Sequence, residues 1–274
     1  MLQFTIDESR CTRCHACAND CPIKIIHLKD GWPTIPEHKQ ASCFKCFHCL
    51  AVCPTAALSI LGKHPDECHS LRGALPSAAQ LETLLKGRRS VRRYRAENLD
   101  RETIDRLLGA AWHGASGHNA RQVRLTVVDD RDALQRLRGD VLARIAELVR
   151  NRALPEGLES FSTFVRAWER NGEDIIFRGA PHLLIASADE RCATPQTDCV
   201  IALAGFELLA QSMGIGTLWN GLAKWSLERI MPELPDRLGV PKDHRIGYVM
   251  SFGRPAVIYH RTAPHRPEIV RAGY

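Results

Sequence analysis

The chain has 274 residues, 45% of them hydrophobic and 25% charged, with a formal net charge of +6 at pH 7. This is an ordinary globular composition, with room for one main domain and a smaller one. The basic residues are scattered along the chain, whereas a nucleic-acid-binding protein more often gathers them on one element. We therefore expect a mildly basic surface and no nucleic-acid partner.

Residues 199–219 form the most apolar stretch of the chain, but Glu207 and Gln211 interrupt it. The stretch predicts a buried core helix rather than a membrane span. The sequence opens with acidic residues and cysteines, which is not the pattern of a secretion signal. We expect a cytoplasmic protein, and in that compartment clustered cysteines indicate metal ligands more often than disulfides.

Eight of the eleven cysteines lie between residues 11 and 53 and form a repeat. Each run has the spacing C-x2-C-x2-C-x3-C followed by proline, and the second run lies 32 residues after the first. Zinc usually takes its ligands as two separated pairs, whereas this run is the bacterial ferredoxin pattern for a [4Fe-4S] cluster. Residues 1–62 thus resemble a bacterial two-cluster ferredoxin, with zinc or disulfides as the alternatives.

In such two-cluster modules the fourth cysteine of each run ligates the other cluster. We therefore expect two [4Fe-4S] clusters with crossed ligand sets. The first set is Cys11, Cys14, Cys17 and Cys53, and the second is Cys43, Cys46, Cys49 and Cys21. The histidines inside the runs, His15 and His48, are expected to be loop residues, since the cysteines already complete both sets.

Residues 63–80 are rich in Gly, Pro, Ser and His and predict a linker, with a second domain over 81–274. Helices and strands alternate after the linker, which favours an α/β or α+β layer fold. We expect helices over 78–87, 100–112, 132–153 and 199–213, and strands over 123–130, 181–189 and 245–256.

Asp198 precedes the last helix, and we expect it to be the N-cap. Cys199 is expected to be a small core residue, and Cys68 in the linker is given no role.

The sequence RRSVR at 88–92 places three arginines and a hydroxyl at the start of this second domain. On its own the run could be a solvated charge cluster. It follows an electron-transfer module, however, and a flavin is the usual partner that accepts electrons singly and passes on a pair. Arginine forks suit the phosphate of such a cofactor.

Residues 84–262 are similar to the nitroreductase family of FMN enzymes. The family's R-R-S-x-R segment matches residues 88–92, and its Asn/Gln-containing region matches GASGHNARQV at 114–123, with Val123 where proline is usual. An Ala-Pro pair before a strand matches residues 180–181, and a G-x-G-T-x-W-x-G motif matches residues 214–221. A dinucleotide-binding Rossmann site is rejected, because the third glycine is absent and a helix precedes the glycines.

The resemblance implies which residues contact FMN, while no catalytic residue is assigned. It places Arg88, Arg89, Ser90 and Arg92 on the phosphate, Asn119 and Gln122 on the ring or ribityl chain, and Pro181, Leu218, Trp219, Asn220 and Gly221 along the flavin. Arg261 is expected near the phosphate, with Arg254 and Arg266 as rivals.

The expected fold class is α+β: an N-terminal ferredoxin-like 2[4Fe-4S] domain, then a nitroreductase-like three-layer α/β/α FMN domain. The resemblance also implies an obligate homodimer with FMN in the subunit interface. We expect an oxidoreductase that passes electrons between the clusters and FMN and reduces a small acceptor such as a nitroaromatic, quinone or activated alkene. Ferredoxin or NAD(P)H would be the donor, and no membrane partner is expected. The alternatives are an electron relay without a small-molecule substrate and an iron–sulfur sensor.

Overall fold

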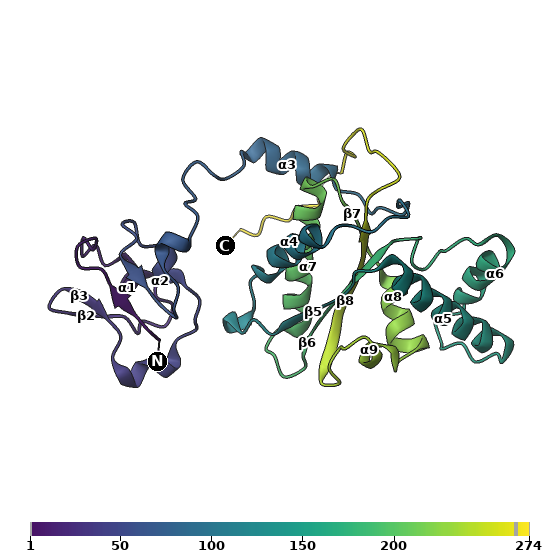
Figure 1. The fold of residues 1–274 in the computed structure, drawn as a ribbon, viewed down its shortest axis with the longest axis horizontal. Helices are drawn as coiled ribbons and strands as arrows, with labels where there is room; N and C mark the ends of the chain where they lie inside the picture. Colours follow the sequence, from purple (N-terminus) through teal and green to yellow (C-terminus); the bar gives the residue numbers. More distant parts are fainter. Residues whose placement is uncertain (1, 266–267, 274) are drawn as a thin grey trace. The chain divides into compact units, whose positions relative to one another are not determined.

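The computed structural model describes residues 2–265 and 268–273, and the chain divides into two compact units (Figure 1). The first unit holds Met1–Pro76 and His118–Ala120, and the second holds Ser77–Gly117 and Arg121–Tyr274. The boundary between Pro76 and Ser77 falls inside the stretch expected to be a linker. Within the described ranges, no helix combines the length and the apolar character needed to cross a membrane.

The first unit is built from short elements around the two cysteine runs. Strand β1 (Thr5–Ile6) pairs antiparallel with β4 (Leu58–Ser59), and β2 (His27–Lys29) pairs antiparallel with β3 (Trp32–Thr34). Two short helices, α1 (Ala16–Asp20) and α2 (His48–Ala51), each contain the third cysteine of a run and pack against each other. The 3₁₀-helical segments η1 (Glu37–Ser42) and η2 (Pro65–Glu67) complete the unit.

The sequence repeat is also a repeat of backbone conformation. Arg13 and Lys45, 32 residues apart, have φ of 55° and 53°, and His15 and Phe47, also 32 apart, have φ of 61° and 59°. A left-handed conformation is uncommon for residues other than glycine, so its recurrence at matched positions is a specific feature of both loops. Each C-x2-C-x2-C loop therefore turns sharply twice before its helix begins.

Sulfur forms part of the core of the first unit. Cys17, Cys21 and Cys49 are buried among aliphatic residues that include Ile25 and Leu58. All eleven cysteines of the chain are free thiols in the structure. The packing around these thiols is therefore not supported by a disulfide.

The second unit contains an antiparallel sheet of four strands in the order β5 (Val123–Val128), β6 (His182–Asp189), β8 (His244–Gly253) and β7 (Gly216–Trp219). Strand β6 is buried from His182 to Ala188, as expected for a central strand with helices on both faces. The register between β6 and β8 shifts at Ala186 and Ser187. At this irregularity a Cβ on Gly247 would lie 2.2 Å from the Cβ of the buried Cys199, so only glycine allows α7 to approach.

Helices cover both faces of this sheet (Figure 1). Leu184 and Ala186 of β6 share one core with α4 and α7, while Leu183 and Ile185 share the other core with α5 and its neighbours. The three-layer α/β/α arrangement expected from the sequence is thus confirmed. The helical segments are α3 (Ala78–Gly87), α4 (Arg101–Trp112), η3 (Gly117–Asn119), α5 (Arg131–Arg150), α6 (Phe161–Asn171), α7 (Pro195–Ser212), α8 (Gly221–Trp225), the π-helical η4 (Ser226–Ile230) and α9 (Leu234–Arg237).

The main difference from the sequence-based expectation is at the start of α7. The helix begins at Pro195 with Thr194 as its N-cap, so the expectation that Asp198 caps it is wrong. Proline suits the first helical position because its missing N–H would have no partner there. Asp198 lies instead within the first turn, where its carboxylate is buried. Helix α6 and strand β7 were not anticipated either.

A buried ion pair ties α5 to the loop after α6. Arg138 lies 3.1 Å from the Asp174 carboxylate, with side chains 15% and 7% exposed, and the Arg138 guanidinium stacks over Trp168. The Asp174 carboxylate also accepts hydrogen bonds from the backbone of Phe177 and Gly179, each at 2.8 Å. Removing this carboxylate leaves a cation and two N–H groups without their partner.

Asp174→Ala is therefore expected to lower the free energy of unfolding of the second unit by about 3–5 kcal/mol, the usual cost of breaking a buried pair. Urea unfolding followed by tryptophan fluorescence measures this change. Asp105→Ala is the control, because it removes an exposed i,i+4 pair with Arg101 and should cost under about 0.5 kcal/mol. If the two variants lost the same free energy of unfolding, the stabilising role of the buried Arg138–Asp174 pair would be contradicted.

A second prediction concerns His182, at the start of β6, which is fully buried. Its Nε2 accepts the N–H of Leu99 at 2.9 Å, and its Nδ1 has no hydrogen-bond partner among the residues that the structure describes. Burial lowers the pKa of His182 from its ordinary value of 6.5, although the nearby charges of Asp129 and Asp130 oppose the shift. The unfolded chain therefore takes up this proton at a higher pH than the folded chain does.

The contribution of neutral His182 to the free energy of unfolding should be fully present above about pH 6.5. As the pH is lowered, the free energy of unfolding should fall by up to about 1.4 kcal/mol per pH unit, because of this single proton. In His182→Gln the pH dependence between pH 7.5 and 5.5 is expected to be shallower than in the wild type, whatever the absolute stability of the variant. His113→Gln, at an exposed position, should keep the wild-type slope. An unchanged slope in His182→Gln would refute the prediction.

Candidate functional site: two sulfur-lined cavities and an arginine-rich sheet edge

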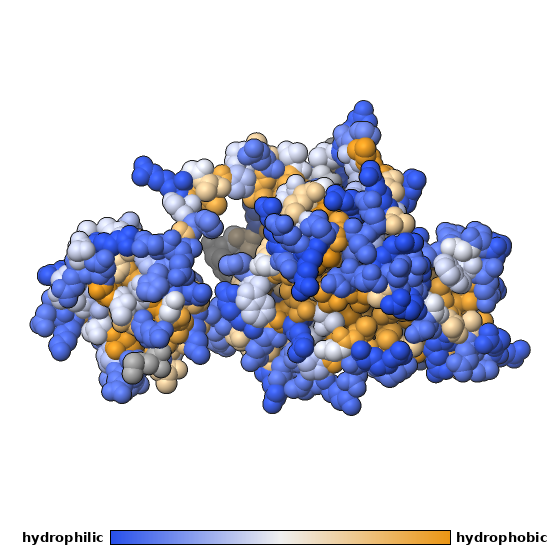
Figure 2. All heavy atoms as spheres, in the orientation of Figure 1, coloured by the Kyte–Doolittle hydropathy of each residue, from blue (hydrophilic) through white to orange (hydrophobic). Residues whose placement is uncertain are grey.

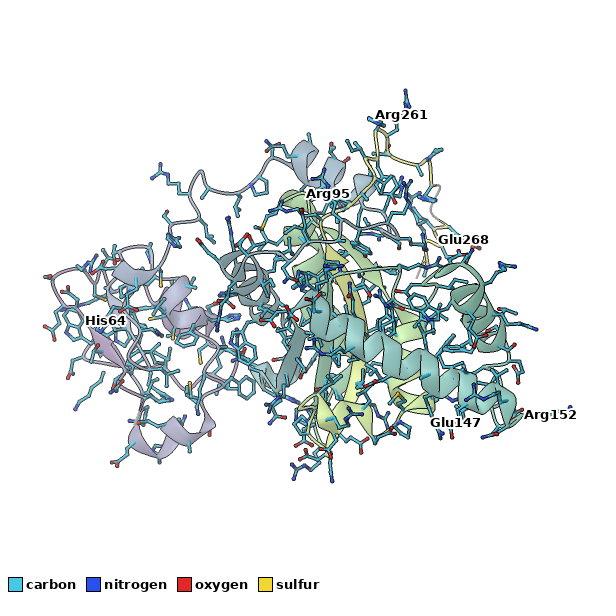
Figure 3. All side chains as sticks on the ribbon, turned by 45° about the vertical axis from the view of Figure 1, so that its right-hand side comes forward. His64, Arg95, Glu147, Arg152, Arg261 and Glu268 are labelled. Atoms are coloured by element: carbon cyan, nitrogen blue, oxygen red, sulfur yellow. The ribbon has the colours of Figure 1, made fainter. Side chains whose placement is uncertain are left out.

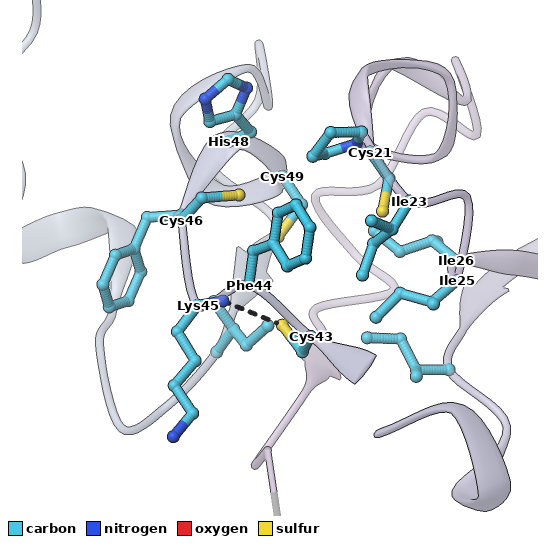
Figure 4. Close-up of a pocket in the computed structure, with 14 residues that line it drawn as sticks. Cys21, Ile23, Ile25, Ile26, Cys43, Phe44, Lys45, Cys46, His48 and Cys49 are labelled. Carbon is cyan, nitrogen blue, oxygen red and sulfur yellow. Dashed lines mark hydrogen bonds between the residues drawn. The ribbon is translucent and has the colours of Figure 1, made fainter. Parts of the chain in front are cut away.

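The first cavity lies in the N-terminal unit and is lined by Cys43, Cys46, Cys49 and Cys21 (Figure 4). It encloses about 380 Å³ of space, including its mouth, and apolar side chains from Ile23 to Ile35 close one side. Three of its cysteines come from the second run and one from the first. The local fold thus brings together the second set of four expected from the sequence.

The second cavity contains the complementary set. Cys11, Cys14, Cys17 and Cys53 line it together with Leu58 and other residues, and the cavity and the open solvent at its mouth together measure about 330 Å³. The last cysteine of each run therefore faces the cavity of the other run. Among the described residues, no three Cys, His, Asp or Glu side chains are grouped as ligands of a single metal ion. Each cavity is lined by four cysteine sulfurs, the number of ligands that a [4Fe-4S] cluster takes.

The backbone around the cavities fits a negatively charged group coordinated by sulfur. The N–H of Ala57 donates to Cys53 Sγ at 3.2 Å, and the N–H of Lys45 donates to Cys43 Sγ at 3.4 Å (Figure 4). Turns that combine right- and left-handed residues form concave N–H surfaces of the kind found around iron–sulfur clusters. Burial raises the pKa of Cys17 and raises that of Cys49 to about 12. A thiolate at these positions needs the positive charge of a metal.

In the second unit, the arginine-rich segment lies along the edge of the sheet. Ser90 forms a parallel bridge with Thr217 of β7, and the N–H of Val91 donates to the Thr217 carbonyl at 2.8 Å. A Cβ on Gly216 would lie 2.7 Å from Val91 Cγ2, so glycine is needed for the segment to pack this closely. The two motifs, RRSVR and G-x-G-T-x-W-x-G, are thus neighbours in space.

The three arginines of this segment have different partners. Arg89 donates to the carbonyls of Lys86 and Arg88, and Arg92 donates to the carbonyl of Ser90. These acceptors carry no net charge, so both guanidinium groups retain the charge needed for a phosphate. Arg88 instead lies 3.4 Å from the carboxylate of Glu207 on α7.

Glu207 was missed as a functional candidate, because the sequence shows it only as a charge that interrupts an apolar helix. It is 6% exposed, and its carboxylate also accepts hydrogen bonds from Thr217 Oγ1 and Trp219 Nε1, each at 3.0 Å. A carboxylate within so apolar a helix was itself the available signal, because buried acids are rare unless paired.

In β7 and just after it, the expected flavin residues have structural roles of their own. Asn220 is buried, donates to the Ile176 carbonyl and to Ser251 Oγ at 2.9 Å, and caps α8 by accepting from the Ala223 N–H. Its side chain is therefore fully used by the fold. Leu218 is also buried. The indole of Trp219 meets Tyr248 edge to face, with centroids 5.3 Å apart, and Gly221 faces the Tyr248 hydroxyl.

The segment around residues 114–122 is held by polar contacts. The Asp198 carboxylate accepts the N–H of Gly117 at 3.1 Å and the hydroxyl of Thr194 at 2.8 Å. The side-chain carbonyl of Gln122 accepts a hydrogen bond from Cys192 Sγ. Asn119 belongs to the first unit, where its amide donates to the carbonyls of Phe44 and Lys45 at 2.8 and 3.1 Å.

The remaining expected contacts lie at opposite extremes of exposure. Pro181 is buried beneath Gly253, where an added Cβ would lie 2.4 Å from the proline ring. Arg261 is exposed in the segment after β8 and extends away from the sheet (Figure 3). Its rival Arg254 forms an ion pair with Glu97 at 3.3 Å, and Arg266 lies outside the described residues.

Known proteins match both parts of the chain. Residues 85–254, more than half of the chain, match the nitroreductase family, and residues 10–58 match a 4Fe-4S dicluster domain. A putative NADH dehydrogenase/NAD(P)H nitroreductase of Archaeoglobus fulgidus is 27% identical over 168 residues, 61% of this chain and 81% of that protein. An uncharacterized protein of Methanocaldococcus jannaschii is 34% identical over 61 residues, 22% of this chain and only 21% of that relative.

The fold has solved counterparts as well. A crystal structure of a nitroreductase with bound FMN from Bacteroides fragilis superposes with a TM-score of 0.56 at 21% identity, covering 70% of this chain and 99% of that one. At this identity the likeness concerns the fold, while membership rests on the family match. The chain belongs to the nitroreductase family of flavin oxidoreductases, and a ferredoxin-like iron–sulfur domain precedes its nitroreductase domain.

Proposed function

We propose that the protein is an FMN-dependent oxidoreductase that passes electrons between two [4Fe-4S] clusters and FMN and reduces a small acceptor such as a nitroaromatic, a quinone or an activated alkene. The observation that carries the proposal is the pair of crossed cysteine sets in a chain that also has a nitroreductase domain. The clusters would supply electrons one at a time, and the flavin would supply two-electron chemistry.

The first unit contributes the eight ligands and the surroundings of the clusters. Cys11, Cys14, Cys17 and Cys53 would hold one cluster, and Cys43, Cys46, Cys49 and Cys21 the other. The isoleucines around the second set limit the access of water, and N–H groups donate to sulfur. Hydrogen bonds and solvent exposure of this kind tune cluster potentials.

The second unit offers a set of donors suited to a flavin phosphate. Arg89, Arg92 and Ser90 lie where the segment meets β7, and within the described residues the two guanidinium groups donate to backbone carbonyls. Trp219, Gly221 and Gln122 would lie along the ring or ribityl chain. Asn220 and Leu218 would act through the backbone, because their side chains are buried in the fold.

We also propose that the protein works as a homodimer. Helix α7 is apolar on nearly every side, and Val200 and Ile201 on its outer face are each 37% exposed. Exposed apolar side chains also occur on the neighbouring α4, where Trp112 is 49% exposed. Most of the surface in view is hydrophilic, with apolar patches between helices of the second unit (Figure 2). A second copy would bury such a face and complete a flavin site shared by two chains.

The donor would be reduced ferredoxin or NAD(P)H. Free cysteines suit the reducing conditions of the cytoplasm, where we place the protein.

The proposal is tested by anaerobic purification followed by iron and flavin analysis and by turnover. We expect about eight iron atoms and one FMN per chain, and oxidation of the reduced flavin by a nitroaromatic, quinone or enone. If none of these acceptors oxidises the reduced flavin, the protein would instead be an electron relay without a small-molecule substrate. Protein that retains iron but binds no flavin would indicate an iron–sulfur sensor and overturn the proposal.

A second test concerns the crossed ligand sets. Because Cys21 lies with Cys43, the double variant Cys21→Ser/Cys43→Ser should damage a single cluster and retain about four iron atoms per chain. Cys21→Ser/Cys11→Ser changes one ligand in each set and should damage both clusters. The single variant Cys21→Ser should disturb the second cluster before the first, as followed by EPR.

Cys68→Ser is the matched control, because Cys68 is exposed and outside both cavities, and it should keep the full iron content. If each run instead held its own cluster, the two double variants would show the reverse pattern. That reversal would refute the crossed assignment.

A further inference from the structure

One buried carboxylate, Glu207, connects two parts of the flavin site that the sequence treats separately. On one side it faces Arg88 of the RRSVR segment at 3.4 Å. On the other it accepts the indole N–H of Trp219 at 3.0 Å. Thr217, between them on β7, donates its hydroxyl to the same carboxylate at 3.0 Å. One side chain from α7 thus contacts Arg88, at the C-cap of α3, and two residues of β7.

The environment of Glu207 makes these contacts obligatory. Its side chain is 8% exposed, and it lies on a helix otherwise composed largely of apolar residues. A carboxylate in such surroundings must be paired and hydrogen-bonded to remain charged. Arg88, 37% exposed, is its cationic partner and is also the first arginine of the segment expected to bind the phosphate.

We propose that Glu207 is a positioning residue that couples the phosphate end of the FMN site to its ring end. By sharing the Arg88 guanidinium, it reduces the positive charge that Arg88 offers to the phosphate and leaves most of that interaction to Arg89 and Arg92. By holding the Trp219 indole, it fixes the wall along the flavin ring. This inference rests on the proposed function, since it assumes that FMN binds along β7.

The two halves of the coupling predict opposite effects in Glu207→Gln. Glutamine keeps the size of the side chain but removes its charge, so Arg88 is released toward the phosphate. Its amide group also competes for the position that accepts the Trp219 N–H, so the ring wall is held less firmly. Binding of FMN relative to riboflavin, which lacks only the phosphate, separates these effects.

The experiment titrates FMN and riboflavin into the full-length protein after its flavin has been removed anaerobically, and follows the quenching of flavin fluorescence. In Glu207→Gln we expect riboflavin to bind more weakly, while the preference for FMN over riboflavin rises about tenfold, as a gain of one charged contact would give. Arg88→Gln should lower the preference instead. In the double variant the Glu207 substitution should no longer change the preference.

Glu228→Gln is the matched control, because it removes the same charge from a residue of this unit that pairs only locally, with Lys224. It should leave both affinities unchanged. If Glu207→Gln weakens FMN and riboflavin by the same factor, Glu207 only supports the fold and the inference is overturned. If its effect on the preference persists without Arg88, the coupling is likewise refuted. Wild-type protein that binds neither flavin would overturn the proposed function itself, and this inference with it.

Discussion

Burial of β6 on both faces is the constraint on which the second unit depends. Every side chain from His182 to Ala188 is enclosed, so helices must cover the sheet on each side. α4 and α7 cover one face, and α5 with its neighbours covers the other. Contacts this close require small residues at the crossings, as where Gly247 meets Cys199. With both faces filled, the edge beside β7 is where the arginine segment can be added.

Several polar groups inside this unit fix the positions of their neighbours. Glu207 orients Arg88 and Trp219, while Asn220 connects the end of β7 to β8 and α8. Asp198 fixes Gly117 in the segment that precedes β5. Buried polar groups with complete hydrogen bonding favour a single arrangement of their neighbours. The proposed flavin site would therefore be formed largely before the cofactor arrives.

The first unit follows a different principle, because its core is too small to rely on hydrocarbon alone. Sulfur from Cys17, Cys21 and Cys49 takes the place of aliphatic side chains, and the burial that raises the pKa of Cys49 also favours a bound metal over a bare thiolate. Since each run supplies a residue to the cavity of the other, neither half of the repeat can complete its cavity alone. We infer that metal binding and folding of this unit are coupled.

The sequence by itself determined the features that depend on local chemistry: the cysteine spacing, the two-part organisation, the central strands and the long helices. The assignment of the chain to the nitroreductase family followed from short sequence motifs. Tertiary structure alone decided which groups meet over long separations. It showed that Thr194, not Asp198, caps α7, that Asn220 is occupied by the fold, and that Glu207 lies beside Arg88, 119 residues away along the chain. The physical reason is that periodicity shows which face of an element is buried, whereas the partner of a buried polar group depends on how whole layers pack.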